Sequence, residues 1–171
     1  MNGMNSIEVR RVQGADYQVL AWLWQCFRHD LAGFVSAVPY PDGRYQPAGL
    51  PTGPSDDVAA YLVRQPHPRT GEPAPVAFAV VKGLTGERNN LSALWVAPPV
   101  RSTGLGRKLA LDVIARHPGA WTLAFQEANQ RAVAFWRRTA DEGFGAGTWR
   151  EVERAVPHDP TLPPDHWIET L

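Results

Sequence analysis

One short segment combines an arginine, two glycines and a predicted helix start in an order that suits anion binding. It reads R-S-T-G-L-G-R from Arg101 to Arg107, and a proline pair at Pro98 and Pro99 lies just before it. Glycine gives the backbone unusual angles and lets a bulky ligand approach the peptide groups closely. The first amides of a helix have no internal partner and carry the positive end of its dipole. The segment therefore predicts a phosphate or pyrophosphate site.

The residues on either side supply the elements that this site needs. Residues 91–97, L-S-A-L-W-V-A, are apolar at both alternating sets of positions, as expected for a strand that is covered on both faces. Pro99 lacks a backbone donor and disfavours helical angles at Pro98, so the strand must end there. After the turn the apolar residues follow a helical period: Leu105, Leu109, Ala110, Val113 and Ile114.

The spacing of the glycines discriminates between phosphate ligands. A dinucleotide fingerprint requires a glycine where Leu109 stands, and the G-x-x-x-x-G-K-[ST] loop is absent. R-x-x-G-x-G after L-x-V and a proline turn instead resembles the acetyl-CoA motif of the GNAT N-acetyltransferase superfamily. The segment N-x-x-A-x-x-F-W, from Asn129 to Trp136 with Gly143-Phe144 after it, is similar to the second signature of that family. The resemblance covers about residues 76 to 144.

The resemblance implies acetyl-CoA as co-substrate and transfer of its acetyl group to a primary amine, in a ternary complex without a covalent enzyme intermediate. The acceptor would be a small molecule or a peptide. Residues 94–96 would meet the acetyl and pantetheine arm through their backbone, and residues 101–107 would wrap the pyrophosphate. Asn129 would either cap its helix or bond the pantetheine arm, and both roles stay open. The implied cofactor-binding residues are Leu94, Trp95, Val96, Arg101, Ser102, Thr103, Gly104, Leu105, Gly106, Arg107, Asn129, Phe135 and Trp136.

Two departures from the family pattern leave the catalytic residues unassigned. Trp136 stands where many relatives have a tyrosine acid, and Asn90 stands near the position of a glutamate base. Neither side chain titrates usefully. Positioning of a neutral amine can still suffice, because a thioester has a good leaving group. Glu127, Asp42 and Glu87 are candidate bases acting through water, although surface carboxylates are usually only solvated. The alternative function is a non-catalytic CoA-binding regulatory or sensing module.

Composition excludes several other classes of protein. The 171 residues carry 17 basic and 17 acidic side chains, so the basic excess of nucleic-acid binders is missing. No apolar run reaches the roughly 20 residues of a membrane span, and we expect no secretory signal. One cysteine, Cys26, suits a reducing cytoplasm and is predicted to be buried. Seven tryptophans leave room for a homodimer interface. The histidines lack metal-site spacing, so we expect no metal: His29, His67, His117, His158 and His166.

These patterns together predict one α/β (α+β) domain over residues 1–171, with a mostly antiparallel sheet that splays open between residues 91–97 and 121–125. A helix capped by Asp16 should end near residue 31 and bury Trp22, Trp24 and Phe27 in the core. Residues 32–54 form a long loop, interpreted as a substrate lid or a mobile insertion. The remaining expected elements are strands at 7–9, 76–81, 148–156 and 167–170, a short helix that begins at Ser55 and ends by Pro66, turns at 67–75 and 85–90, and a proline-rich link before the last strand.

Overall fold

The computed structural model describes residues 7–155 and 164–171, which form a seven-stranded sheet and three α-helices. The strand order is β1-β2-β3-β4-β5-β7-β6, and every neighbouring pair is antiparallel except the parallel pair β4 and β5. This confirms the predicted mixed, mostly antiparallel fold. The elements are β1 (Val9–Arg11), α1 (Asp16–Val35), β2 (Val58–Pro66), β3 (Pro73–Lys82), β4 (Arg88–Val96), α2 (Leu105–Arg116), β5 (Ala120–Phe125), α3 (Gln130–Phe144), β6 (Trp149–Arg154) and β7 (Asp165–Thr170).

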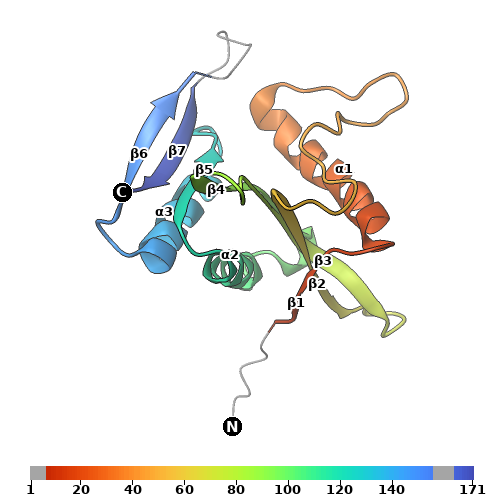
Figure 1. Cartoon of the computed structure of the whole chain (residues 1–171). Coiled ribbons are helices and arrows are strands. Elements are labelled where there is room, and N and C mark those ends of the chain that lie inside the picture. Colours follow the sequence, from red (N-terminus) through yellow and green to blue (C-terminus); the bar gives the residue numbers. More distant parts are fainter. Residues whose placement is uncertain (1–6, 156–163) are drawn as a thin grey trace.

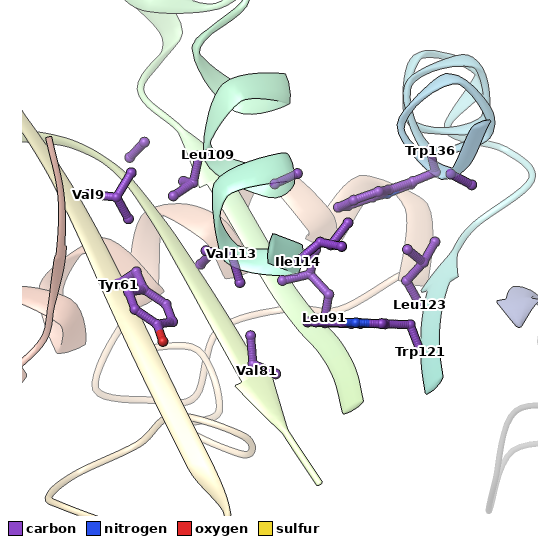
Figure 2. Close-up of a cluster of buried hydrophobic side chains, with 14 of the residues drawn as sticks. Val9, Tyr61, Val81, Leu91, Leu109, Val113, Ile114, Trp121, Leu123 and Trp136 are labelled. Atoms are coloured by element: carbon purple, nitrogen blue, oxygen red, sulfur yellow. The ribbon is translucent and has the colours of Figure 1, made fainter. Parts of the chain in front are cut away.

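The sheet separates two apolar cores. Helices α2 and α3 pack on one face and α1 packs on the other (Figure 1). The larger core lies under α2 and α3, and Figure 2 shows its side chains meeting from β2, β3, β4, β5 and both helices. The smaller core joins Leu20 and Trp24 of α1 to Phe78 and Trp95 of the sheet. None of the helices in the described residues combines the length and the apolar character that a bilayer span demands.

The prediction of a short helix from Ser55 to about Pro66 is wrong, because Val58–Pro66 is strand β2. The run V-A-A-Y-L-V lies between β1 and β3 and is buried on both faces. A doubly buried strand has no alternation in its hydrophobicity, so periodicity cannot distinguish it from a helix. The predicted cap residue is used differently, since the Ser55 hydroxyl accepts a hydrogen bond from the Asp57 amide at 3.1 Å and so forms a turn before the strand.

Helix α1 is longer than expected and exposes two residues that were predicted to be buried. It begins at Asp16 and continues to Val35, past the predicted end near residue 31. Asp16 provides no side-chain cap and instead pairs with Arg64 of β2 at 2.8 Å. Trp24 is buried as predicted, but Trp22 is 64% exposed and Cys26 is exposed. Both point away from the Leu20–Trp24 stripe, because a helix turns 100° per residue.

Several strand boundaries differ from the predictions. The polar segment expected as a turn at 85–90 already contains the start of β4 at Arg88, and β3 begins at Pro73 inside the predicted turn at 67–75. The first strand is Val9–Arg11, while β6 ends at Arg154 and β7 begins at Asp165. The last predicted residue of the 148–156 strand, residue 156, and most of the proline-rich link, with His158, lie outside the described residues.

A β-bulge at Ser92 determines where the sheet opens. In the β3–β4 ladder Val80 pairs with Ala93 and Val81 pairs with Leu91, so Ser92 is the extra residue. Leu91 therefore lies in the core of α2, whereas Ala93 lies in the core of α1, contrary to the simple alternation that the sequence suggests. Pairing of β4 with β5 runs from Arg88 to Leu91 and stops there. The predicted splay is confirmed, and it starts directly at the bulge.

His117, at the end of α2, lies in a partly buried cluster of hydrogen bonds. Its Nε2 lies 2.6 Å from the Tyr61 hydroxyl, and its carbonyl accepts hydrogen bonds from Asn89 and from the Trp121 indole. Burial lowers the pKa of His117, and the nearby Arg11 and Arg116 lower it further.

We expect the free energy of unfolding to fall as the pH is lowered below about 6.5, the ordinary histidine pKa. In that range the unfolded chain binds a proton that folded His117 does not, so protonation favours unfolding, with a slope of at most about 1.4 kcal/mol per pH unit. Urea denaturation at several pH values measures this slope. It should shrink in His117→Gln and persist in His29→Gln, an exposed histidine; an unchanged slope in His117→Gln would contradict the assignment.

Candidate active site

The segment after β4 makes a compact turn that leads directly into α2. Residues Pro98–Val100 form one turn of 3-10 helix, and the Thr103 hydroxyl donates to the Val100 carbonyl at 2.8 Å. Ser102 and Gly104 have positive φ values of 63° and 85°. Gly104 occupies the N-cap position of α2, where a left-handed backbone favours glycine. Positive φ at two nearby residues bends the chain sharply between strand and helix.

The backbone amides of this turn are not used by the described part of the chain. No hydrogen bond is recorded from the amides of residues 102–107, and the first helical bond across the cap is from the Lys108 amide to the Gly104 carbonyl at 3.0 Å. The first turn of α2 contains no acidic residue, and residues 101–104 are exposed. An anion at this place would satisfy several orphan donors and the helix dipole together. The residues present therefore fit a diphosphate.

Arg101 is held by two other elements. Its Nε donates to the Val96 carbonyl at 2.8 Å, and its Nη2 forms an ion pair with Asp30 of α1. The Trp95 indole also donates to the Asp30 carboxylate, at 2.9 Å. One carboxylate thus joins α1 to both the end of β4 and the turn. Asp30 was not predicted as a site residue, because nothing in the helical pattern of α1 indicates which strand residue it meets.

Arg107 points away from the turn toward α3. Its Nε donates to Glu142 at 2.6 Å, and this pairing holds the pKa of Glu142 below its usual range. The Arg107 backbone amide, not its guanidinium, is therefore the group that faces the predicted phosphate position. Surface ion pairs of this kind contribute little, about 0 to 1 kcal/mol.

Gly106 marks a close approach between α2 and the separated part of β4. A Cβ atom on Gly106 would lie 3.2 Å from Val96 Cγ2, 3.7 Å from Phe135 and 3.8 Å from Leu94. Three of the predicted cofactor-binding residues therefore surround this glycine. Leu94 and Val96 face the core of α2 and α3, while the Trp95 side chain faces α1.

Asn129 caps α3, as one of its two proposed roles requires. Its Oδ1 accepts a hydrogen bond from the Ala132 amide at 3.2 Å. The cap uses only the oxygen, so the amide nitrogen of Asn129 stays available to a ligand.

Substitution of Asn129 should separate the two roles. Asn129→Ala removes the cap and should lower the free energy of unfolding by about 1 kcal/mol. Asn129→Asp keeps a capping oxygen and should leave stability nearly unchanged while removing the amide donor. Thermal denaturation and acetyl-CoA titration of both variants measure the outcome. If Asn129→Asp binds acetyl-CoA as well as the wild type, Asn129 is only a cap.

Trp136 is a core residue. Its side chain is 8% exposed and belongs to the larger core. Figure 2 shows it extending from α3 toward Ile114 and Leu123. Phe135 meets Trp136 edge to face, with ring centroids 4.7 Å apart, and is the one of the two that contacts the Gly106 region. The indole ring of Trp136 therefore contributes to the core and provides no ionisable group at this position.

The candidate bases lie in different surroundings. Asp42 is exposed and paired with Arg44, which holds the pKa of Asp42 below its usual range. Glu87 is exposed in the segment between β3 and β4. Glu127 follows β5 and lies 3.5 Å from His166 Nε2. Asn90 lies within β4 and pairs with Thr122 of β5, next to the splay.

Glu127, Glu151 and His166 bring three potential metal ligands within 4.8 Å of one another, an arrangement that the sequence spacing of His166 does not reveal. Glu151 already accepts two hydrogen bonds from Arg137, which holds the pKa of Glu151 below its usual range, and a contact from His166 at 3.0 Å. A cation would have to compete with Arg137 for this carboxylate. The expectation of no metal stays a prediction.

The loop after α1 is fastened to that helix. Gln25 accepts from the Tyr45 amide at 2.7 Å and donates to the Tyr45 carbonyl at 3.2 Å, as a paired strand would. His29 lies 3.3 Å from the Tyr45 hydroxyl. Between the loop and α1 lies a mainly apolar cavity of about 320 Å³, lined by Gln18, Ala21, Trp22, Gln25, Tyr40, Asp42, Arg44, Tyr45, Pro47 and Leu50. Trp22, which was expected in the core, lines this cavity instead.

Comparison with known proteins identifies related sequences and folds. A family model described as the acetyltransferase (GNAT) family matches residues 14–140. No curated protein sequence matches the chain. The Arabidopsis thaliana NAA60 structure in complex with a bisubstrate analogue is similar with a TM-score of 0.62 and 13% identity, over 96% of this chain and 98% of that one.

Two other solved structures are similar over nearly their whole length. A structure from Corynebacterium glutamicum, described as histone acetyltransferase HPA2 and related acetyltransferase, has a TM-score of 0.61 and 18% identity, with 96% of each chain covered. A Vibrio cholerae spermidine N-acetyltransferase chimera has a TM-score of 0.60 and 10% identity, over 98% of this chain and 96% of that one. At these identities the likeness shows a shared fold.

Proposed function

We propose, from the premise that this chain belongs to the GNAT acetyltransferase family, that it transfers an acetyl group from acetyl-CoA directly to a primary amine. The observation that carries the proposal is the run of unbonded amides from Ser102 to Arg107 at the start of α2. These amides would hold the diphosphate, and Gly106 lets the start of α2 lie close to Val96 of β4. When bound, acetyl-CoA supplies an acetyl thioester whose carbonyl carbon accepts the amine while the thiol leaves.

The residues of this chain would act mainly by positioning. The backbone of β4 beyond the Ser92 bulge has no partner strand on the β5 side among the described residues. Its peptide groups can therefore meet the thioester arm and stabilise charge that develops on the carbonyl oxygen. Trp136 is buried and carries no acid proton, so the thiolate would leave without help from this position. Holding a neutral amine against a thioester is the larger demand.

Isothermal titration with acetyl-CoA and a thiol-release assay over a panel of amines test the proposal. We expect binding in the micromolar range and thiol release with at least one acceptor. An absence of binding at millimolar acetyl-CoA would reject the cofactor assignment.

A CoA-binding sensor without catalysis is the second candidate. Two observations favour it: Trp136 is packed in the core, and Asn90 stands beside the splay without an ionisable group. Tight acetyl-CoA binding with no thiol release over any acceptor would support the sensor and exclude the transferase.

A further inference from the structure

A row of polar side chains crosses the sheet on the face of α1. Cross-strand pairing places Lys82 of β3 beside Asn90, Asn90 beside Thr122, and Thr122 beside Glu169 of β7. Paired residues point to the same side of a sheet. The neighbours Val81, Leu91, Leu123 and Ile168 lie in the core of α2 and α3, so the polar row faces the opposite way. The row lies immediately before the bulge that opens the sheet.

A direct transfer requires the acceptor to arrive on this face. Gly106, Val96 and Phe135, which surround the predicted cofactor position, lie on the face of α2 and α3. The splay between β4 and β5 connects the two faces beyond Ser92. An amine that attacks from the side opposite the cofactor therefore passes over the polar row and beside α1.

Arg28 of α1 has a buried guanidinium nitrogen for which the described residues provide no acceptor. It is half-buried, its Nε is buried and has no hydrogen bond, and no ion pair is recorded for it among the described residues. Burial lowers the pKa of Arg28, and Tyr40 of the loop is the charged or titratable group that faces it. A buried donor without an acceptor is costly, so the site gains when an anion binds.

Lys82 lies on the same flank of α1. Its Nζ would lie 3.2 Å from a Cβ on Gly49, and the Trp24 ring would lie 3.4 Å from the same point. Arg28 follows Trp24 by one helical turn, so both cations flank this tryptophan under the loop. Like Arg28, Lys82 is half-buried and has no recorded ion pair within the described residues. Each cation is half-buried without a recorded anion in the described part of the chain, so a bound carboxylate would offset the cost of their burial.

The charges at the other end of the row are paired with one another. Glu169, 5% exposed, is the row's carboxylate, and it is already paired with Arg150 at 3.2 Å and with Arg154. Arg154 also lies across from Asp165 of β7, so Arg150 and Arg154 are balanced by two carboxylates, and Arg28 and Lys82 are left without a recorded ion pair among the described residues. A polyamine acceptor would be repelled by this surface.

We infer that the acceptor amine carries an anionic group, of the carboxylate class, which binds between Arg28 and Lys82. The inference rests on the proposed function and specifies its substrate class. The polar row at Asn90 and the predicted thioester position at Leu94 are separated along β4 by about 13 Å, at 3.3 Å per residue. The Lys82 side chain spans part of this distance, so the carboxylate of the acceptor would lie several bonds from its reacting amine. Amino acids with a long side chain and peptides with an acidic residue near the N-terminus meet this requirement.

Matched acceptors and variants test the inference. The thiol-release assay compares lysine with cadaverine, and Ala-Glu amide with Ala-Gln amide, for the wild type, Arg28→Gln, Arg28→Lys and Lys82→Gln. Arg69→Gln, in the exposed β2–β3 turn, is the matched control. We expect the carboxylate-bearing acceptor to have a kcat/KM at least about 10-fold higher, as a charged hydrogen bond implies. Arg28→Gln and Lys82→Gln should remove this preference, Arg28→Lys should restore part of it, and Arg69→Gln should leave it unchanged.

Equal or higher kcat/KM with cadaverine and Ala-Gln amide would overturn the inference. So would an equal loss of kcat/KM for both acceptors of a pair in Arg28→Gln or Lys82→Gln. If acetyl-CoA does not bind or no acceptor reacts, the proposed function fails, and titration with glutarate then decides this inference separately. Glutarate binding that is weakened in Arg28→Gln and Lys82→Gln, but retained in Arg69→Gln, supports the anion site. Charged hydrogen bonds should give a Kd below about 10 mM. An absence of glutarate binding to the wild type at that concentration would contradict the anion site.

Discussion

Gly106→Val should weaken acetyl-CoA binding by at least about 100-fold, which corresponds to about 2.7 kcal/mol. The first added carbon would already lie 3.2 Å from Val96 Cγ2, and the valine methyl groups would extend into the space shared by Phe135 and Leu94. A side chain there would push the start of α2 away from the splayed half of β4, between which the proposed function places the thioester arm. Gly106→Ala should give an intermediate loss, because its single carbon requires Val96 to move by only a few tenths of an ångström.

Stability must be measured beside affinity, since overpacking itself costs about 1 to 3 kcal/mol. Gly33→Val is the matched control, because Gly33 lies on the exposed face of α1 with no atom within 4 Å of its added Cβ. We expect that control to bind acetyl-CoA like the wild type in isothermal titration. A destabilised Gly106→Val protein that retains full affinity would place the cofactor somewhere else.

The strand-turn-helix unit is the part of the molecule that local physics makes predictable. Prolines, glycines and a helical apolar period all act within a few residues, so the turn before Leu105 and the start of α2 follow from the sequence directly. The β2 strand does not, because burial on both faces removes the alternation on which a strand prediction depends. Its neighbours β1 and β3 produce that burial, and they are remote in sequence.

The bulge at Ser92 shows the same limit inside a correctly predicted strand. A one-residue insertion in the ladder exchanges the two faces of β4, so Leu91 and Ala93 enter different cores. No side-chain pattern marks Ser92, whose hydroxyl donates to the Val80 carbonyl at 3.2 Å. The polar row from Lys82 to Glu169 could not be predicted for a related reason: it exists only through the register of four strands.

The side-chain partners of the predicted cofactor-binding residues could not be predicted from the sequence either. Arg101 was predicted to border the phosphate, but its interaction with Asp30 joins residues 71 positions apart. The exposed Trp22 is the converse case: its helical position is adjacent to the apolar stripe in sequence, yet its face of α1 meets a loop and a cavity and not the sheet.

Asp30→Ala should raise the Kd for acetyl-CoA by about 10-fold with little change in kcat. The Asp30 carboxylate holds Arg101 and the Trp95 indole together, and a hydrogen bond to a charged group contributes about 1.5 to 3 kcal/mol. The lower end applies, because the Asp30 side chain is 39% exposed and its ion pair is partly screened. Without the carboxylate, Arg101 keeps its bond to the Val96 carbonyl and loses the ion pair that joins the turn of residues 98–104 to α1.

A double-mutant cycle distinguishes this positioning role from a general loss of stability. If Asp30 acts through Arg101, then Asp30→Ala with Arg101→Ala should bind acetyl-CoA no worse than Arg101→Ala alone, since residues in one network are not additive. Asp56→Ala, an exposed aspartate ahead of β2, should leave the affinity unchanged. Additive losses in the cycle would instead mean that Asp30 stabilises α1 independently of the turn. Because Asp30 and the half-buried Arg28 lie on opposite flanks of α1, a coupled result would assign the Asp30 flank to support of the cofactor turn, and the acceptor assays test the Arg28 flank separately.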